Sequence, residues 1–192
     1  MLKKLRKNEK GLVEGIFAVV LIFMVAMGIF TVRSQAKTVS VKNELQGIVD
    51  NAAIGALVKS VDDTMVMDEG FRVDASAVRA NFEEIFERAM AETSNNFIGN
   101  TRIRRFHVHT VDTTDNNTAI ADNRQQGGRY QAYLDVAVAA DYPTHNIFEA
   151  GRPSRVRFHN IITGADEEIT DNPPTRNSGT VIVRSLERVV LR

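Results

Sequence analysis

The chain has 192 residues, of which 24 are lysine or arginine and 24 are aspartate or glutamate, so its formal net charge at pH 7 is zero. This balance gives no electrostatic reason to expect a nucleic acid or another acidic polymer as a partner. The sequence contains no cysteine, which excludes disulfide bonds, thiolate metal sites and cysteine nucleophiles.

An apolar run stands near the N-terminus, from Leu12 to Val32, and Glu14 is its only charged residue. About 20 apolar residues in a helix, at roughly 1.5 Å per residue, cross a hydrocarbon core of roughly 30 Å. No other stretch of the sequence is comparably long and apolar. We therefore expect one transmembrane helix over residues 12–33 and a single-pass membrane protein.

The charges on either side of the apolar run predict its orientation. Five basic residues precede the run: Lys3, Lys4, Arg6, Lys7 and Lys10. Arg33 and Lys37 follow it. This excess predicts a cytoplasmic basic leader over residues 1–11 and an extracytoplasmic C-terminal domain. A cleaved signal peptide has a shorter apolar core, of about 7 to 15 residues, so a retained anchor is the favoured interpretation.

The next segment, residues 34–67, is predicted to be an amphipathic helix that emerges from the membrane and runs to about Val66. Its apolar residues recur at steps of three and four. They are Val41, Leu45, Ile48, Val49, Ala52, Ala56, Leu57, Val58, Val61 and Met65. A neighbouring surface must cover this stripe, because each large apolar side chain left in water forgoes roughly 1.5 to 3 kcal/mol of burial.

Residues 68–192 are predicted to form an extracytoplasmic α+β domain. A second helix begins after Asp74, a suitable N-cap, and ends around residues 94–96. The period then changes to two in four segments, which predicts four antiparallel strands. These centre on residues 106–111, 130–140, 155–159 and 180–191. Polar loops are expected over residues 112–128, 142–153 and 164–179. We expect the strands, with Val156 and Phe158 among their apolar residues, to pack on the helices.

The last strand changes parity along its length. Val181 and Val183 share one parity, whereas Leu186 and Val190 share the other. The pattern predicts a β-bulge near Arg184 or Ser185.

The residues Gly11-Leu12-Val13-Glu14 open the apolar helix. With the basic leader before them, they resemble the start of type IV pilin-like subunits, in particular the TadE-like pseudopilins of tight-adherence pili. The resemblance covers roughly residues 3 to 33. It implies a pilin-like fold, assembly through the N-terminal helix, and a role for Gly11 and Glu14 in that assembly.

Two interpretations of Glu14 stay open. In pilins such a glutamate neutralises the new N-terminal amine of a cleaved subunit. In those families the processing glycine stands five positions before the glutamate, where this chain has Glu9. We therefore expect the leader to be retained. The alternative is a plain i,i+4 pair between Lys10 and Glu14 near the membrane interface.

The sequence offers little for metal binding or catalysis. His107 and His109 share one face of a strand but have no further ligand nearby in sequence, so a solvent-facing pair is expected. The oxygen-rich run Asp112–Asn117 lacks the spacing of a calcium loop. No nucleophile elbow or phosphate-binding glycine loop is present. We expect no enzyme activity, cofactor, metal or small-molecule substrate.

The sequence thus predicts a structural, membrane-anchored, pilin-like subunit that assembles with copies of itself or related subunits into a pilus or a secretion or conjugation apparatus. The predicted helix-to-helix contact consists of Leu45, Ile48, Val49 and Ala52, which lie closer to the membrane than the rest of the stripe. The alternative is a signal-anchored extracytoplasmic binding or accessory module that does not polymerise.

Overall fold

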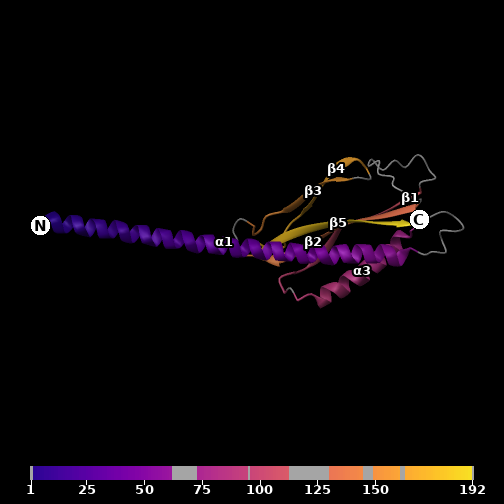
Figure 1. Cartoon of the computed structure of the whole chain (residues 1–192), viewed down its shortest axis with the longest axis horizontal. Helices are drawn as coiled ribbons and strands as arrows, with labels where there is room; N and C mark the ends of the chain where they lie inside the picture. Colours follow the sequence, from indigo (N-terminus) through magenta and orange to yellow (C-terminus); the bar gives the residue numbers. More distant parts are fainter. Residues whose placement is uncertain are drawn as a thin grey trace. The chain divides into compact units, whose positions relative to one another are not determined.

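The computed structural model describes residues 2–61, 73–94, 96–112, 130–144, 149–160 and 163–191. Figure 1 shows the helices and strands of these residues. They are α1 (Leu2–Ser60), α3 (Ala75–Glu92), β1 (Thr101–Asp112), β2 (Tyr130–Pro143), β3 (Ser154–Asn160), β4 (Ala165–Asp171) and β5 (Ser178–Leu191). The chain divides into two compact units, Met1–Val39 and Ser40–Arg192. The α+β class expected from the sequence is confirmed.

The first unit is the N-terminal part of α1, and the rest of α1 belongs to the second, folded unit. In the folded unit, α1 presents a stripe at helical spacing whose members are fully buried: Val41, Leu45, Val49, Ala52 and Ala56. The helix ends at Ser60, whereas the sequence suggested an end near Val66, a position outside the described residues. The Val61 N–H still donates to the Leu57 carbonyl at 3.1 Å.

Helix α3 begins where the sequence predicted. The Asp74 carboxylate accepts a hydrogen bond from the Ser76 N–H at 2.8 Å and so caps the first turn. Val78, Phe82 and Phe86 form its buried stripe at steps of four residues. Phe82 stacks on Phe86 with ring centroids 5.6 Å apart. One face of α3 is therefore buried in the apolar core.

In the described part of the chain, five strands form two sheets rather than the single four-stranded sheet that the sequence suggested. Strands β1, β2 and β5 form an antiparallel sheet with β2 in the middle, and β3 pairs with β4 as a separate hairpin. The missed strand, β4, lies within the expected polar loop 164–179. Its residues include Asp166, Glu167 and Glu168, and a strand so rich in acids lacks the apolar alternation that marks a half-buried strand.

The three-stranded sheet packs on the helices through one of its faces. Alternate residues of β2 enter the core because side chains of a strand point to opposite faces in turn. These are Ala132, Leu134, Val136, Val138, Ala140 and Tyr142. Val181 and Val183 of β5 and the partly buried Phe106 and Val108 of β1 join them against α1 and α3. The core of the folded unit therefore lies between the helices and this sheet face.

The hairpin of β3 and β4 covers the opposite face of the same sheet. Glu167 of β4 pairs with Arg105 of β1. The centroid of the Phe158 ring of β3 lies 3.8 Å from the guanidinium carbon of Arg184 of β5. The prediction that Phe158 packs on the helices is therefore wrong. The folded unit has three layers: helices, central sheet and hairpin.

The expected bulge near Arg184 is absent, since β5 pairs with β2 in unbroken register from Ser178 to Leu191. The change of parity has another cause. Both faces of β5 are covered near its start, so Ile182 is buried on the hairpin side while Val181 and Val183 are buried on the helix side. The register shift that the structure does contain lies in β1, between Ile103 and Arg105.

Candidate functional sites

The apolar surface of α1 in the first unit is the largest feature that the fold leaves uncovered. Large side chains from Val13 to Val32 are exposed around the whole helix circumference, Phe17 at 70% and Phe23 at 66% among them. This helix is long and apolar enough to cross a membrane, judged by length and composition. A helix that is apolar all round is stable when lipid or other apolar helices surround it.

The predicted assembly residues Gly11 and Glu14 both belong to α1. The Glu14 side chain is exposed within the apolar segment, one position before Gly15. The side chain of Lys10, the partner expected in the alternative interpretation, lies outside the described residues. Within a hydrocarbon layer, a carboxylate at this place would need a counter-charge, a proton or the membrane interface, because hydrocarbon does not solvate it.

The predicted helix-to-helix contact is corrected by the structure. Leu45, Val49 and Ala52 are fully buried within their own folded unit, and Ile48 is partly buried against the same core. Their partners come from the protein's own sheet and from α3, so these side chains are not available to a second copy. The expectation failed because the sheet reaches further along α1 than the sequence indicated.

A charged cluster lies between the central sheet and the hairpin. Asp135 of β2 is fully buried, and its two carboxylate oxygens accept hydrogen bonds from Arg105 Nε at 2.5 Å and Arg184 Nε at 2.7 Å. Arg105 also pairs with Glu167 of the hairpin. The Phe158 ring lies against both arginines, with its centroid 5.2 Å from the guanidinium carbon of Arg105 and 3.8 Å from that of Arg184. A buried carboxylate with two guanidinium partners is the arrangement that an interior requires of a charge.

A second charged cluster lies further along the same interface. Arg102 donates two hydrogen bonds to Asp141, at 2.5 and 2.8 Å, and two to Asp171 of the hairpin, at 2.9 and 3.0 Å. Arg104 adds a contact to Asp171 at 3.0 Å. Burial alone would raise the pKa of Asp141, but hydrogen bonds from Arg102 and Thr180 and the charge of Arg102 outweigh it and lower that pKa.

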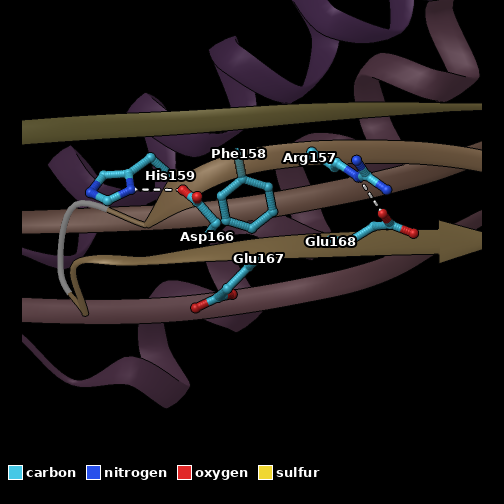
Figure 2. Close-up of a pocket in the computed structure, with 6 residues that line it drawn as sticks. All are labelled: Arg157, Phe158, His159, Asp166, Glu167 and Glu168. Carbon is cyan, nitrogen blue, oxygen red and sulfur yellow. Dashed lines mark hydrogen bonds and ion pairs between the residues drawn. The ribbon is translucent and has the colours of Figure 1, made fainter.

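An open groove of about 600 Å³ follows the hairpin itself, as Figure 2 shows. It is lined by Arg157, Phe158, His159, Asp166, Glu167 and Glu168. Arg157 donates to Glu168 at 2.6 Å, and His159 contacts Asp166 at 2.9 Å. The hydrogen bond from Arg157 lowers the pKa of Glu168. The groove is therefore lined by more carboxylates than cations, and two of the three carboxylates, Glu167 and Glu168, already pair with arginines.

The weaker sequence candidates gain no support as binding sites. His107 is exposed and His109 half-buried, and among the described residues no three histidine, aspartate or glutamate side chains gather closely enough to hold a metal ion. In the oxygen-rich run 112–117, residues 113–117 lie outside the described part of the chain.

The two charged clusters were not identified by sequence reasoning. A signal for them was present: Asp135 and Asp141 interrupt the most apolar strand of the domain, where an unpaired charge would be costly.

Comparison of the chain with family models, with curated proteins and with solved structures finds no match.

Proposed function

We propose that this protein is a structural, membrane-anchored subunit that assembles through the apolar part of α1, residues 13–32, with copies of itself or related subunits. The proposal rests on one observation above all: large apolar side chains are exposed around the whole of this helix segment. In the proposal the basic leader lies in the cytoplasm and the folded unit outside the membrane, as the positive-inside bias favours.

Helix association in a bilayer depends on close approach of backbones, because lipid tails are as apolar as the helix side chains. Gly15 and Gly28 lie on this segment, and a Cβ atom added at either would meet nothing within 4 Å. They are therefore places where a neighbouring helix has room to approach. The resemblance of Gly11-Leu12-Val13-Glu14 to pilin-like subunits supports the same mode of assembly, with a structural rather than a catalytic role.

Substitution of glycines within one helix tests the proposal. The variant Gly15→Leu/Gly28→Leu adds bulk in the apolar segment, whereas Gly47→Leu adds it on the same helix in the folded unit, at another position with nothing within 4 Å. We expect lysine-reactive crosslinking in membranes to give multimers of the wild-type chain and of the Gly47 variant, and monomers of the double variant. Multimers of all three chains, or of none, would refute assembly through this segment.

A second candidate is a tethered module that does not polymerise. It is favoured by the intramolecular burial of Leu45, Val49 and Ala52, which leaves the folded unit with no need of a partner to cover this stripe. Only monomers of the wild-type chain in the crosslinking experiment would favour it.

Protease added to intact cells, with the outer membrane permeabilised if there is one, tests the membrane orientation that both candidates share. In both, it should remove the folded unit and spare a membrane-embedded fragment.

A further inference from the structure

The central sheet is held on its two faces by different forces. Its helix-facing side forms a continuous apolar core. Its hairpin-facing side is held largely by the two charged clusters, with Phe158 as the main ring contact. An apolar interface that opens exposes surface that water does not solvate well, whereas an opened ionic interface regains hydration of its charges. The hairpin side is therefore the easier of the two to open.

The connectivity also separates the hairpin from the rest of the sheet. Strand β2 ends at Pro143, which pairs with Ser178, the first residue of β5. The pairing of β2 with β5 is thus complete up to this end without any contribution from β3 or β4. Two backbone hydrogen bonds hold the root of the hairpin, Thr144 N–H to the Asn177 carbonyl at 3.1 Å and Gly151 N–H to the Ser178 carbonyl at 3.0 Å.

The two sides of the interface carry opposite charge. To the two charged clusters the sheet side contributes four arginines, Arg102, Arg104, Arg105 and Arg184, and two aspartates, Asp135 and Asp141. The surplus of two positive charges meets Glu167 and Asp171, the two carboxylates that β4 directs to this interface. Attraction between the layers therefore depends on these two hairpin carboxylates being ionised.

Other titratable groups lie on or near these surfaces. By strand alternation His107, His109, Tyr133 and Arg188 share the sheet face with Asp135 and Arg184. The histidines add positive charge to the sheet side when protonated. On the hairpin the remaining charged side chains of β3 and β4 alternate to the outer face: Arg155, Arg157, His159, Asp166 and Glu168.

We propose that the β3–β4 hairpin is a flap that opens as a unit from the central sheet at acid pH and at high ionic strength, while the core between the helices and the sheet stays folded. The flap is a conformational device of the folded unit and is independent of how the chain assembles in the membrane. Opening uncovers the hairpin-facing side of β2, including Ala137 and Ala139, which are fully buried when the flap is closed.

The direction of the pH effect follows from the carboxyl groups. The pKa of Glu167 is lowered from its ordinary value of 4.5, first by the hydrogen bond from Asn160 and then by Arg105. The hydrogen bond from Asn160 lies within the hairpin and persists when the flap opens, so only the part of the lowering that is due to Arg105 stabilises the closed state. This contribution is present above the ordinary pKa and is lost as the pH falls through the lowered value. Below that range the arginines remain charged and lose their carboxylate partners on the hairpin. Salt weakens the same pairs at neutral pH by screening.

Thiol labelling of adjacent residues tests this flap, since the chain has no cysteine of its own. Ala139 and Ala140 of β2 are both fully buried, the first towards the hairpin and the second towards the helices. The full chain in detergent, as Ala139→Cys or as Ala140→Cys, is treated with a dithiodipyridine reagent, and each rate is corrected for a model thiol at that pH. At about pH 3.5, or in about 1 M salt at pH 7, we expect the rate at position 139 to rise about tenfold or more and that at position 140 to stay unchanged.

Charge variants of β4 provide the matched controls. In the Ala139→Cys background, Glu167→Gln/Asp171→Asn should give fast labelling at pH 7 in low salt, and Glu168→Gln, on the outer face of the same strand, should not. Equal protection at 139 and 140 under acid and salt would overturn the flap. Exposure of both positions together would also overturn it, because it indicates unfolding of the whole unit. So would a neutralised variant that stays protected at pH 7.

Hydrogen exchange of the wild-type chain gives a second measurement if a cysteine variant fails to fold. At constant neutral pH, peptides covering β3 and β4 should lose protection in about 1 M salt, because a two-stranded hairpin released from the central sheet is only marginally stable in water, while peptides covering α3 and the paired part of β2 keep theirs. Unchanged protection of the hairpin, or equal loss in α3, would contradict the proposal.

Discussion

At the scale of single residues, Asp135 shows how a charge is accommodated inside an apolar strand. Its neighbours in sequence, Leu134 and Val136, belong to the apolar core, and the carboxylate points the other way, to Arg105 and Arg184. One guanidinium nitrogen of Arg184, Nη2, is itself buried without a hydrogen-bond partner among the described residues. The cluster therefore depends strongly on Asp135.

We predict that Asp135→Asn lowers the free energy of unfolding by roughly 3 to 5 kcal/mol, because it removes the counter-charge of the largely buried Arg184 and leaves Arg105 with Glu167 alone. Asp166→Asn is the matched control, since the Asp166 side chain is 91% exposed. Urea unfolding followed by circular dichroism measures both. Midpoints that coincide for the two variants would show that the Asp135 cluster contributes little.

Gly179 is a second residue whose role depends on one neighbour. It pairs with Tyr142 across β2 and β5, and a Cβ atom added there would lie 2.5 Å from a carbon of the tyrosine ring. The ring covers the glycine, and a rigid aromatic ring cannot yield as the end of a flexible side chain would.

Alanine at Gly179 should therefore destabilise the folded unit by about 1 to 3 kcal/mol, the usual cost of overpacking. Alanine at Gly47, a helical glycine with nothing within 4 Å, should instead stabilise it by roughly 0.5 to 1 kcal/mol through helix propensity. Thermal unfolding of the two variants gives the comparison. A shift of the same sign in both would contradict the steric role of Tyr142.

At the scale of elements, α1 serves two environments with one continuous helix. Its first part exposes apolar side chains all round, and its second part buries one stripe under the protein's own sheet. The second part is also joined to α3, through Lys59 to Glu84 at 2.7 Å and the Asn81 amide to the Ser60 hydroxyl at 2.8 Å. These contacts make the later residues of α1 a part of the domain.

Truncation of Leu45 distinguishes an intramolecular core from an intermolecular contact. We predict that Leu45→Ala costs 2 to 5 kcal/mol of stability, roughly the usual loss for a fully buried leucine. Val58→Ala, at a position of the same helix that is 60% exposed, should have little effect. Chemical denaturation of the full chain in detergent measures the difference. If Leu45→Ala removes crosslinked multimers and leaves stability unchanged, the stripe is an interface after all.

At the scale of the whole molecule, the chain combines an uncovered apolar helix with a folded unit whose core is complete. The two parts differ in the solvent they require. The first unit exposes apolar side chains over more than one helix face, which is compatible with a membrane span. The second unit has mostly charged and polar residues on the outer surface of its hairpin.

Charges placed in the apolar segment should separate the chain from the membrane. Val20→Asp/Phe23→Asp introduces two carboxylates, each costing about 2.5 to 3.5 kcal/mol at the centre of a membrane helix. Val39→Asp/Val58→Asp makes the same changes at two exposed positions of α1 outside this segment. We expect only the first variant to leave the pellet in an alkaline carbonate wash of membranes. Retention of both variants would argue against a span at residues 13–32.

Periodicity alone predicted the parts of the fold that local residues control. The apolar run, the N-cap at Asp74 and the alternation in β1, β2 and β5 each depend only on residues within one segment, so they can be recognised from the sequence of that segment. Strand β4 was missed because its inward residues, Glu167 and Asp171, meet arginines, and a charged inner face resembles a loop in sequence.

The amino-acid sequence by itself determined the α+β class, an apolar helix long enough to span a membrane, and the faces that α1 and α3 bury. Only the tertiary structure decided that Leu45, Val49 and Ala52 lie in the protein's own core, and that Asp135 and Asp141 hold a second layer on the sheet. The reason is physical. An apolar stripe or a charge within an apolar strand indicates that a side chain needs a partner. Residues far apart in the chain supply that partner, and only the packed fold brings them together.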